Sequence, residues 1–174
     1  MGDPGGAPRG VPAGPRTAAV VVASTRAARG VYVDETGPLL VEGLRQMGLA
    51  VEDAVVVEDG EPVGRALRAA LDAGAAVVVS TGGTGLTPQD LTPEQTAPLL
   101  DRELPGLAEA LRAQGREKGV ATASLSRGLA GTVGTALVVN LPGSPGACRD
   151  GLAVLADVLP HALDQVAGGD HARP

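Results

Sequence analysis

Aromatic residues are almost missing from this chain. Its 174 residues include one tyrosine, Tyr32, and no phenylalanine or tryptophan. Proteins that bind single-stranded nucleic acid usually stack the bases on aromatic side chains, so the composition argues against that class. The formal net charge of −6 points the same way, because phosphate backbones attract basic surfaces. The core must therefore be built from Val, Leu and Ala.

Cysteine and long apolar runs are also scarce. Cys148 stands alone and cannot form a disulfide within the chain, which is typical of a reducing compartment. No run of about 18 apolar residues is long enough to cross a membrane, and the N-terminus lacks the apolar segment of a secretion signal. We therefore expect a cytoplasmic protein with neither a nucleic-acid nor a membrane partner.

Both ends of the sequence are rich in Gly, Pro and Ala without periodicity, which predicts disordered tails at 1–16 and 168–174. The remaining residues, 17–167, suffice for one well-buried domain. Strand-like apolar runs alternate there with helical patterns. This alternation predicts an α/β fold with three layers, a doubly wound and mostly parallel sheet flanked by helices.

The predicted strands are short β-branched runs bounded by Gly, Pro or polar residues. They cover 17–24, 49–57, 75–80 and 135–140, with an irregular strand in 125–133 that pairs antiparallel to the last. The predicted helices have apolar residues three and four positions apart. They cover 37–47, 62–73, 107–117 and 151–166, and a further helix begins near Pro93 with Thr92 as its cap.

The segment from Ser80 to Thr96, STGGTGLTPQDLTPEQT, carries the strongest functional signal. It follows a buried strand, and ligands of open α/β sheets bind outside the carboxyl ends of the strands. Its three glycines allow close approach of ligand atoms to the backbone. Together with the Thr hydroxyls and Asp90, they favour a phosphorylated ligand and a metal ion. A tight turn that needs glycine for steric reasons is the alternative.

Two familiar phosphate-binding motifs do not fit this loop. A Walker A loop needs Lys and Ser/Thr after its last glycine, where this chain has Leu86-Thr87. The GxGxxG fingerprint of dinucleotide-binding domains is absent from the loop, and no such fingerprint opens a helix after the first predicted strand. A dehydrogenase is therefore disfavoured.

Four loops gather at one edge of the sheet if the strands are parallel. The groups that they carry are Ser24, Thr25, Arg26 and Arg29; Glu58, Asp59 and Glu61; the glycine loop with Asp90; and Leu141–Gly146. Asp59 and Asp90 are each explained equally well as turn or cap residues. Together they suit Mg²⁺, which prefers one or two carboxylates plus phosphates and waters.

The remaining candidates are cations, histidines and the cysteine. Arg26, Arg29 and Arg127 are candidates for neutralising phosphates, although for each of them a merely solvated side chain is the more common explanation. His161 and His171 are predicted to be ordinary surface residues. Cys148 has no evident base partner, so we predict that it packs rather than acts as a nucleophile.

Three stretches together resemble the MogA/MoaB family of molybdenum cofactor biosynthesis proteins and the related gephyrin-type domains. They are the glycine loop, LPGSPGA at 141–147, and Ser24-Thr25-Arg26 with GVYVDETGPLL at 30–40. The resemblance runs from Thr17 to about Val166. It implies molybdopterin adenylyltransferase activity, in which molybdopterin and Mg-ATP give adenylylated molybdopterin and pyrophosphate. It also implies a homotrimer, or a hexamer, and a molybdate-inserting enzyme as a partner.

The family's two functional aspartates fall on Asp59 and Asp90, which the resemblance makes the catalytic residues and the magnesium ligands. The predicted substrate-binding residues belong to the four loops or match ligand-binding positions of the family. They are Ser24, Arg26, Thr81, Gly82, Gly83, Thr84, Gly85, Ser126, Pro142, Gly143 and Ser144.

Two positions depart from the family pattern. The residue before the loop aspartate is usually basic but is Gln89 here, and many members carry an acidic residue where Thr25 stands. Loss of the charge at 89 either weakens phosphate binding or shifts that role to Arg26 or Arg127. A non-catalytic, molybdopterin-binding or scaffold member therefore remains the alternative, and the sequence does not distinguish a molybdenum from a tungsten pathway.

Overall fold

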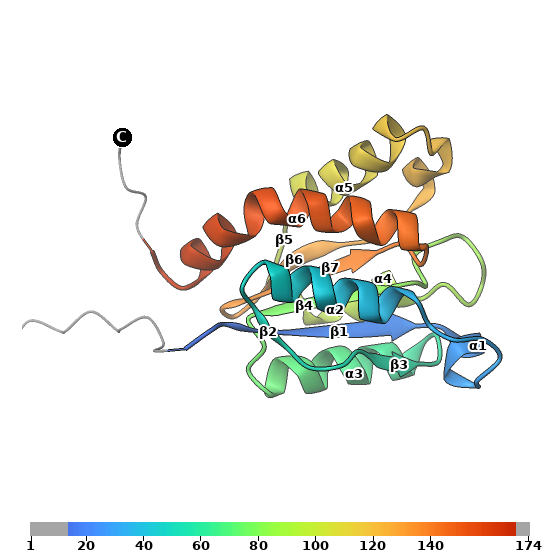
Figure 1. Ribbon diagram of the computed structural model, residues 1–174, viewed down its shortest axis with the longest axis horizontal. Coiled ribbons are helices and arrows are strands. Elements are labelled where there is room, and N and C mark those ends of the chain that lie inside the picture. Colours follow the sequence, from blue (N-terminus) through green and yellow to red (C-terminus); the bar gives the residue numbers. More distant parts are fainter. Residues whose placement is uncertain (1–13, 170–174) are drawn as a thin grey trace, which may run out of the picture.

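A mixed seven-stranded sheet forms the middle layer of the protein (Figure 1). The structure is a computed structural model, and it describes residues 14–169. The order of the strands is β2-β1-β4-β7-β6-β5, and β3 also pairs with β1. β1 is parallel to β2, β3 and β4, and β4 is parallel to β7. β6 is antiparallel to both β5 and β7. The strands are β1 (Thr17–Ala23), β2 (Ala50–Val51), β3 (Val55–Val57), β4 (Val77–Thr81), β5 (Arg102–Glu103), β6 (Ala130–Val133) and β7 (Ala136–Leu141).

Helices cover both faces of the sheet, so the predicted three-layer, mostly parallel α/β fold is confirmed. Buried residues of α2 (Thr36–Gln46), α5 (Pro105–Glu117) and α6 (Pro145–Val166) pack on one face. Figure 1 shows α2 and α6 lying along the sheet. Buried residues of α3 (Glu61–Asp72) pack on the other face of the sheet. The short elements are α1 (Thr25–Ala28), α4 (Thr92–Thr96), η1 (Ala97–Leu99) and η2 (Ala121–Leu125).

The central strands divide their side chains between the two layers with a period of two. In β4, Val77 and Val79 join the cluster under α2 and α6, whereas Val78 joins the cluster under α3. All three are fully buried. A continuous β-branched run buried on both faces is what the sequence predicted for a parallel strand.

The strand predicted at 49–57 is wrong as a single element. β1 pairs Ala18 with Val51 but Val21 with Val55, so the register shifts by one residue between the two short strands. Arg45 donates two hydrogen bonds to the Val51 carbonyl oxygen (3.0 and 2.7 Å), a group that a continuous ladder would use. The adjacent Asp53 is fully exposed, which suits a chain that bulges away from the sheet here.

Two predicted helix starts also need correction. The last helix begins at Pro145, not Gly151, because Ser144 caps it: the Ser144 hydroxyl accepts a hydrogen bond from the Ala147 N–H (3.1 Å). Ser followed by Pro is a usual N-terminal signal, which the Pro/Gly-rich context obscured. Thr92 is the first residue of α4 rather than its cap, and its hydroxyl donates to the Gly82 carbonyl (2.9 Å).

The predicted tails lie largely outside the described residues, and so does His171. Arg16, the last residue of the predicted first tail, is described and forms an ion pair with Asp164 of α6 (2.8 Å), so the tail prediction does not hold at this residue. Within residues 14–169, no helix combines the length and the apolar character that a membrane crossing requires.

Candidate functional site

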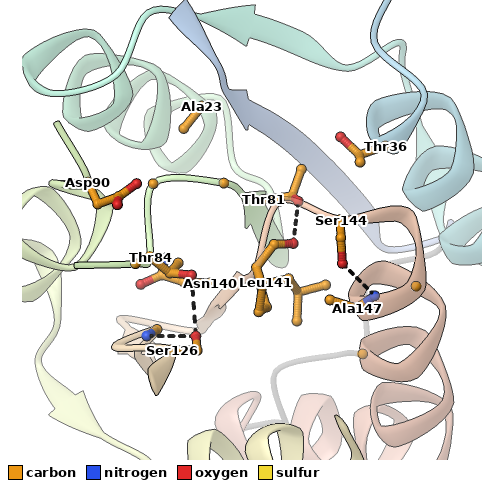
Figure 2. A pocket seen from close by; sticks show the side chains of 18 of the residues that line it. Ala23, Thr36, Thr81, Thr84, Asp90, Ser126, Asn140, Leu141, Ser144 and Ala147 are labelled. Atoms are coloured by element: carbon orange, nitrogen blue, oxygen red, sulfur yellow. Dashed lines mark hydrogen bonds between the residues drawn. The ribbon is translucent and has the colours of Figure 1, made fainter. Parts of the chain in front are cut away.

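A cavity of about 1170 Å³ opens at the carboxyl edge of the parallel strands. It lies where β1, β4 and β7 end, at the point where the chain reverses its direction of winding across the sheet. The four predicted loops all contribute to its wall. In Figure 2, Asp90 lies on one side of this cavity and Ser144 and Thr36 on the other. The predicted site residues all line it: Ser24, Arg26, Asp59, Thr81, Gly82, Gly83, Thr84, Gly85, Asp90, Ser126, Pro142, Gly143 and Ser144.

The glycine loop runs close to its neighbours. Gly82 and Gly83 have φ values of +91° and +64°, which side chains rarely tolerate. A Cβ atom at Gly82 would overlap the carbonyl oxygen of Ala23, and one at Gly83 would overlap the hydroxyl of Thr92. The steric reason for glycine therefore holds at both positions, and both residues also line the cavity.

Hydrogen bonds fasten this loop to the end of β7. The Gly82 N–H donates to the Leu141 carbonyl (3.0 Å), and the Thr81 hydroxyl donates to the Pro142 carbonyl (2.8 Å). Underneath, the buried Asn140 amide donates to the hydroxyls of Ser80 (2.9 Å) and Thr96 (3.0 Å). A buried polar network that is fully satisfied gives the loop one defined position.

Each of the two predicted catalytic aspartates is held by a pair of hydrogen bonds from one threonine. Asp59 accepts two hydrogen bonds at Oδ2, from the N–H (2.9 Å) and the hydroxyl (2.7 Å) of Thr25. Asp90 also accepts two at Oδ2, from the N–H (2.8 Å) and the hydroxyl (2.7 Å) of Thr87. Within residues 14–169, neither Oδ1 atom receives a hydrogen bond, so each carboxylate keeps one oxygen for a ligand.

This donor set fits a magnesium ion that is shared with phosphate. Mg²⁺ is usually bound through one or two carboxylates, with substrate phosphates and waters completing its shell. Among the described residues, no group of three or more His, Cys, Asp or Glu side chains is placed to hold a metal. A metal at Asp59 and Asp90 would therefore depend on oxygens from the substrate.

The candidate arginines differ in whether their guanidinium groups are already engaged by other residues of the protein. Arg29 pairs with Glu58 (2.9 Å) on the surface, and this hydrogen bond lowers the pKa of the Glu58 carboxyl. Arg127 donates to the carbonyls of Gly85 (2.8 Å) and Asp90 (2.6 Å) and pairs with Glu94. The N–H groups of Arg127 are thus used to hold the glycine loop. This argues against the hypothesis that Arg127 takes over phosphate binding from the basic residue usual at position 89.

Arg26 is the arginine of the cavity wall whose guanidinium is available to bind a phosphate. It lines the cavity, and its guanidinium carbon lies 5.2 Å from the centre of the Tyr32 ring. The other basic side chain in the wall, Arg112, already donates to the Ser126 carbonyl (3.0 Å) and pairs with Glu109 (2.6 Å). Of these two guanidinium groups, only that of Arg26 has no hydrogen bond or ion pair within residues 14–169.

The sequence model of a family described as "Probable molybdopterin binding domain" matches residues 19–161. This range holds both aspartates and every loop of the cavity. The chain belongs to this family.

Individual relatives agree with this molybdopterin-binding domain assignment. The molybdenum cofactor biosynthesis bifunctional protein of Chlorobaculum tepidum is 42% identical over 160 residues, 91% of this chain and 50% of the relative. The molybdopterin adenylyltransferase of Pyrococcus furiosus is 39% identical over 149 residues, 83% of this chain and 87% of the relative. The solved molybdopterin biosynthesis Mog protein of Mycobacterium ulcerans superposes with a TM-score of 0.82 at 55% identity, covering 87% and 99% of the two chains. This chain thus spans about half the length of the bifunctional relative.

Cys148 packs beneath the cavity of this molybdopterin-binding domain, as the sequence predicted. It is fully buried, with Sγ 3.3 Å from the Thr81 hydroxyl. Burial raises the pKa of its thiol, so the sulfur stays protonated near neutral pH. His161 is exposed on α6, as predicted.

Sequence reasoning missed several residues of the wall. Tyr32, the one aromatic of the chain, lies at the cavity with its hydroxyl 2.7 Å from that of Ser24. Asp34 caps α2: it accepts from the Thr36 N–H (2.9 Å) and the Gly37 N–H (2.9 Å). An Asp just before a helix start is a capping signal that the sequence did offer, because its carboxylate accepts from the N–H groups of the first turn. Asp150, on α6, also lines the cavity and has no comparable signal.

Proposed function

We propose that this protein adenylylates molybdopterin, using Mg-ATP and releasing pyrophosphate. The observation that carries the proposal is the convergence of Asp59, Asp90 and the glycine loop on one cavity. Membership of the molybdopterin-binding family and relatives named molybdopterin adenylyltransferase support it.

In this reaction, an oxygen of the molybdopterin phosphate forms a bond to the α-phosphorus of ATP. The bond between the α-phosphorus and its bridging oxygen breaks, and pyrophosphate leaves with the electron pair. A phosphate monoester has a second pKa of about 6, so the nucleophile is ionised near neutral pH. No strong general base is needed, and no histidine is among the described residues of the wall.

The protein's contribution is positioning and charge neutralisation. Asp59 and Asp90 would hold Mg²⁺, which neutralises the charge of the ATP phosphates when it is bound. Arg26 would add a guanidinium, which binds phosphate oxygens bidentately. The glycine loop lets phosphate oxygens approach the backbone amides of residues 83–85.

Gln89 does not favour the non-catalytic alternative. Its side chain is exposed and does not line the cavity, so the departure from a basic residue removes no group from the wall. Both aspartates are present, and among the described residues each has one carboxylate oxygen that accepts no hydrogen bond. These observations favour turnover over a scaffold role.

We also propose a homotrimer, or a hexamer, a cytoplasmic location and a molybdate-inserting enzyme as a partner. Light scattering of the purified protein gives the subunit number directly.

The test of the proposed function is Asp90→Asn, with Asp53→Asn as the matched control. We expect Asp90→Asn to bind molybdopterin like the wild type but to release pyrophosphate about a hundredfold more slowly, because the amide is a poor metal ligand. Asp53 is fully exposed between β2 and β3, so its variant should retain wild-type rates. Wild-type pyrophosphate release by Asp90→Asn would contradict the assignment. A wild-type protein that forms no adenylylated molybdopterin would favour the scaffold role.

A further inference from the structure

Two loops that are distant in the sequence are joined by three hydrogen bonds between one pair of residues. Thr25 begins α1 after β1, and Asp59 follows β3. The N–H and the hydroxyl of Thr25 donate to Asp59 Oδ2 (2.9 and 2.7 Å). In return, the Asp59 N–H donates to the Thr25 hydroxyl oxygen (3.1 Å).

These bonds fix how the carboxylate is turned. Both side-chain bonds end on Oδ2, so the carboxylate has little freedom to rotate. Oδ1 is then directed toward the glycine loop, because a Cβ atom at Gly83 would lie 3.3 Å from it. Asp59 therefore presents one chosen oxygen to the cavity.

A third aspartate of the cavity wall, Asp34, offers a comparison, because hydrogen bonds engage both of its carboxylate oxygens. Asp34 Oδ1 accepts from the N–H (2.9 Å) and the hydroxyl (2.7 Å) of Thr36. Its Oδ2 accepts from the Gly37 N–H (2.9 Å), so Asp34 is fully engaged as the cap of α2. Asp59 lacks such a second partner within residues 14–169.

We propose that Thr25 is a positioning residue of the metal and phosphate site. Its hydroxyl holds Asp59 so that Oδ1 faces the ion bound with the nucleotide. This inference rests on the proposed function, in which Asp59 is a magnesium ligand. Thr25 itself touches neither the ion nor the substrate in this role, and acts through the carboxylate.

The test compares three variants of the purified full chain. Thr25→Val removes the hydroxyl and keeps the shape, whereas Thr25→Ser keeps the hydroxyl. Thr17→Val is the control: it removes a hydroxyl bond to the Gly74 carbonyl (3.3 Å) at the opposite end of β1. Binding of Mn²⁺ in the presence of ATP, followed by electron paramagnetic resonance, reports the site without turnover. The Mg²⁺ dependence of pyrophosphate release gives the second readout.

We expect Thr25→Val to need about ten times more Mn²⁺ or Mg²⁺ for half-saturation, the size usual for residues that orient metal ligands. Its kcat at saturating Mg²⁺ should change less than its metal half-saturation. Thr25→Ser and Thr17→Val should match the wild type. If Thr25→Val fails to fold by circular dichroism, Thr25→Ala is titrated instead, since it also lacks the hydroxyl.

Two results would overturn the inference: wild-type Mn²⁺ affinity in a folded variant without the hydroxyl, or a Thr25→Ser variant as weak as Thr25→Val. Failure of the proposed function looks different. In that case the wild type forms no adenylylated molybdopterin, and the Mn²⁺ titration with ATP alone still decides the role of Thr25.

Discussion

The two ends of the parallel sheet use glycine in different ways. At the amino end, Gly48 and Gly74 turn the chain into β2 and toward β4, each with φ +86°. A Cβ atom at either position would meet nothing within 4 Å, so these turns need only the left-handed conformation. At the carboxyl end, Gly82 and Gly83 combine a positive φ with occupied space. The glycines of the carboxyl end are thus closely packed against neighbouring segments, and those of the amino end are not.

The same contrast appears in the polar contacts. The carboxyl end fastens its loops with hydrogen bonds from buried side chains, such as those of Thr81, Thr92 and Asn140. At the amino end, the exposed Thr17 hydroxyl makes a longer bond to Gly74 (3.3 Å). A ligand site needs walls of fixed geometry, whereas a connecting turn does not.

The largest effect should come from Gly82→Ala, compared with Gly74→Ala. A left-handed conformation alone costs a side chain about 1–2 kcal/mol, which is the loss expected for Gly74→Ala, with unchanged activity. At Gly82 the Cβ atom also overlaps the Ala23 carbonyl, so we expect a loss of roughly 3 kcal/mol or more and an inactive protein. Urea unfolding and pyrophosphate release measure both. Equal losses in the two variants would remove the distinction between the two ends.

A smaller effect is expected from Arg127→Met, which tests whether the carboxyl-end loop needs its side-chain fastening. The variant leaves the Gly85 and Asp90 carbonyls without their donor and should cost about 1–2 kcal/mol. Pyrophosphate release should fall about tenfold, because Asp90 loses its fixed position. Arg68→Met, an exposed change on α3, is the control and should have no effect. An Arg127→Met variant with wild-type rates would show that the loop holds its shape without Arg127.

The smallest effect is expected from Glu94→Gln, examined as a function of pH. The hydrogen bond from Arg127 lowers the pKa of the Glu94 carboxyl. Its stabilisation is therefore complete above the ordinary glutamate pKa and is lost as the pH falls through the lowered value. We expect the wild type to have a slightly higher Tm than Glu94→Gln at neutral pH, and the two Tm values to converge once the pH falls below the lowered pKa of Glu94. Calorimetry checks this, and a Tm difference that persists in acid would show that the charge of Glu94 is not its cause.

The central strands and the loops at the site were predictable because their signals are local. A run such as Val77–Val79 flanked by Gly74 and a glycine loop indicates a buried parallel strand with little ambiguity. Once the strands are parallel, their carboxyl ends must share one edge, which brought Asp59 and Asp90 to the same cavity.

Features that depend on partners far along the chain were not predictable. The break between β2 and β3 is a shift of register against β1, which lies more than thirty residues earlier in the chain. The engagement of Arg127 likewise depends on carbonyls of a loop more than thirty residues earlier. The role of Thr25 likewise required Asp59 to be beside it. None of these pairings leaves a periodicity or a motif in the sequence.

The sequence by itself determined that this is an α/β domain with a glycine loop and two aspartates at the strand ends, because hydrophobic periodicity and loop chemistry are local properties. Only the tertiary structure decided which groups remain available there. Hydrogen bonds between distant segments use up Arg127 and one oxygen of Asp59, and leave Arg26 and the other oxygen of Asp59 facing the cavity.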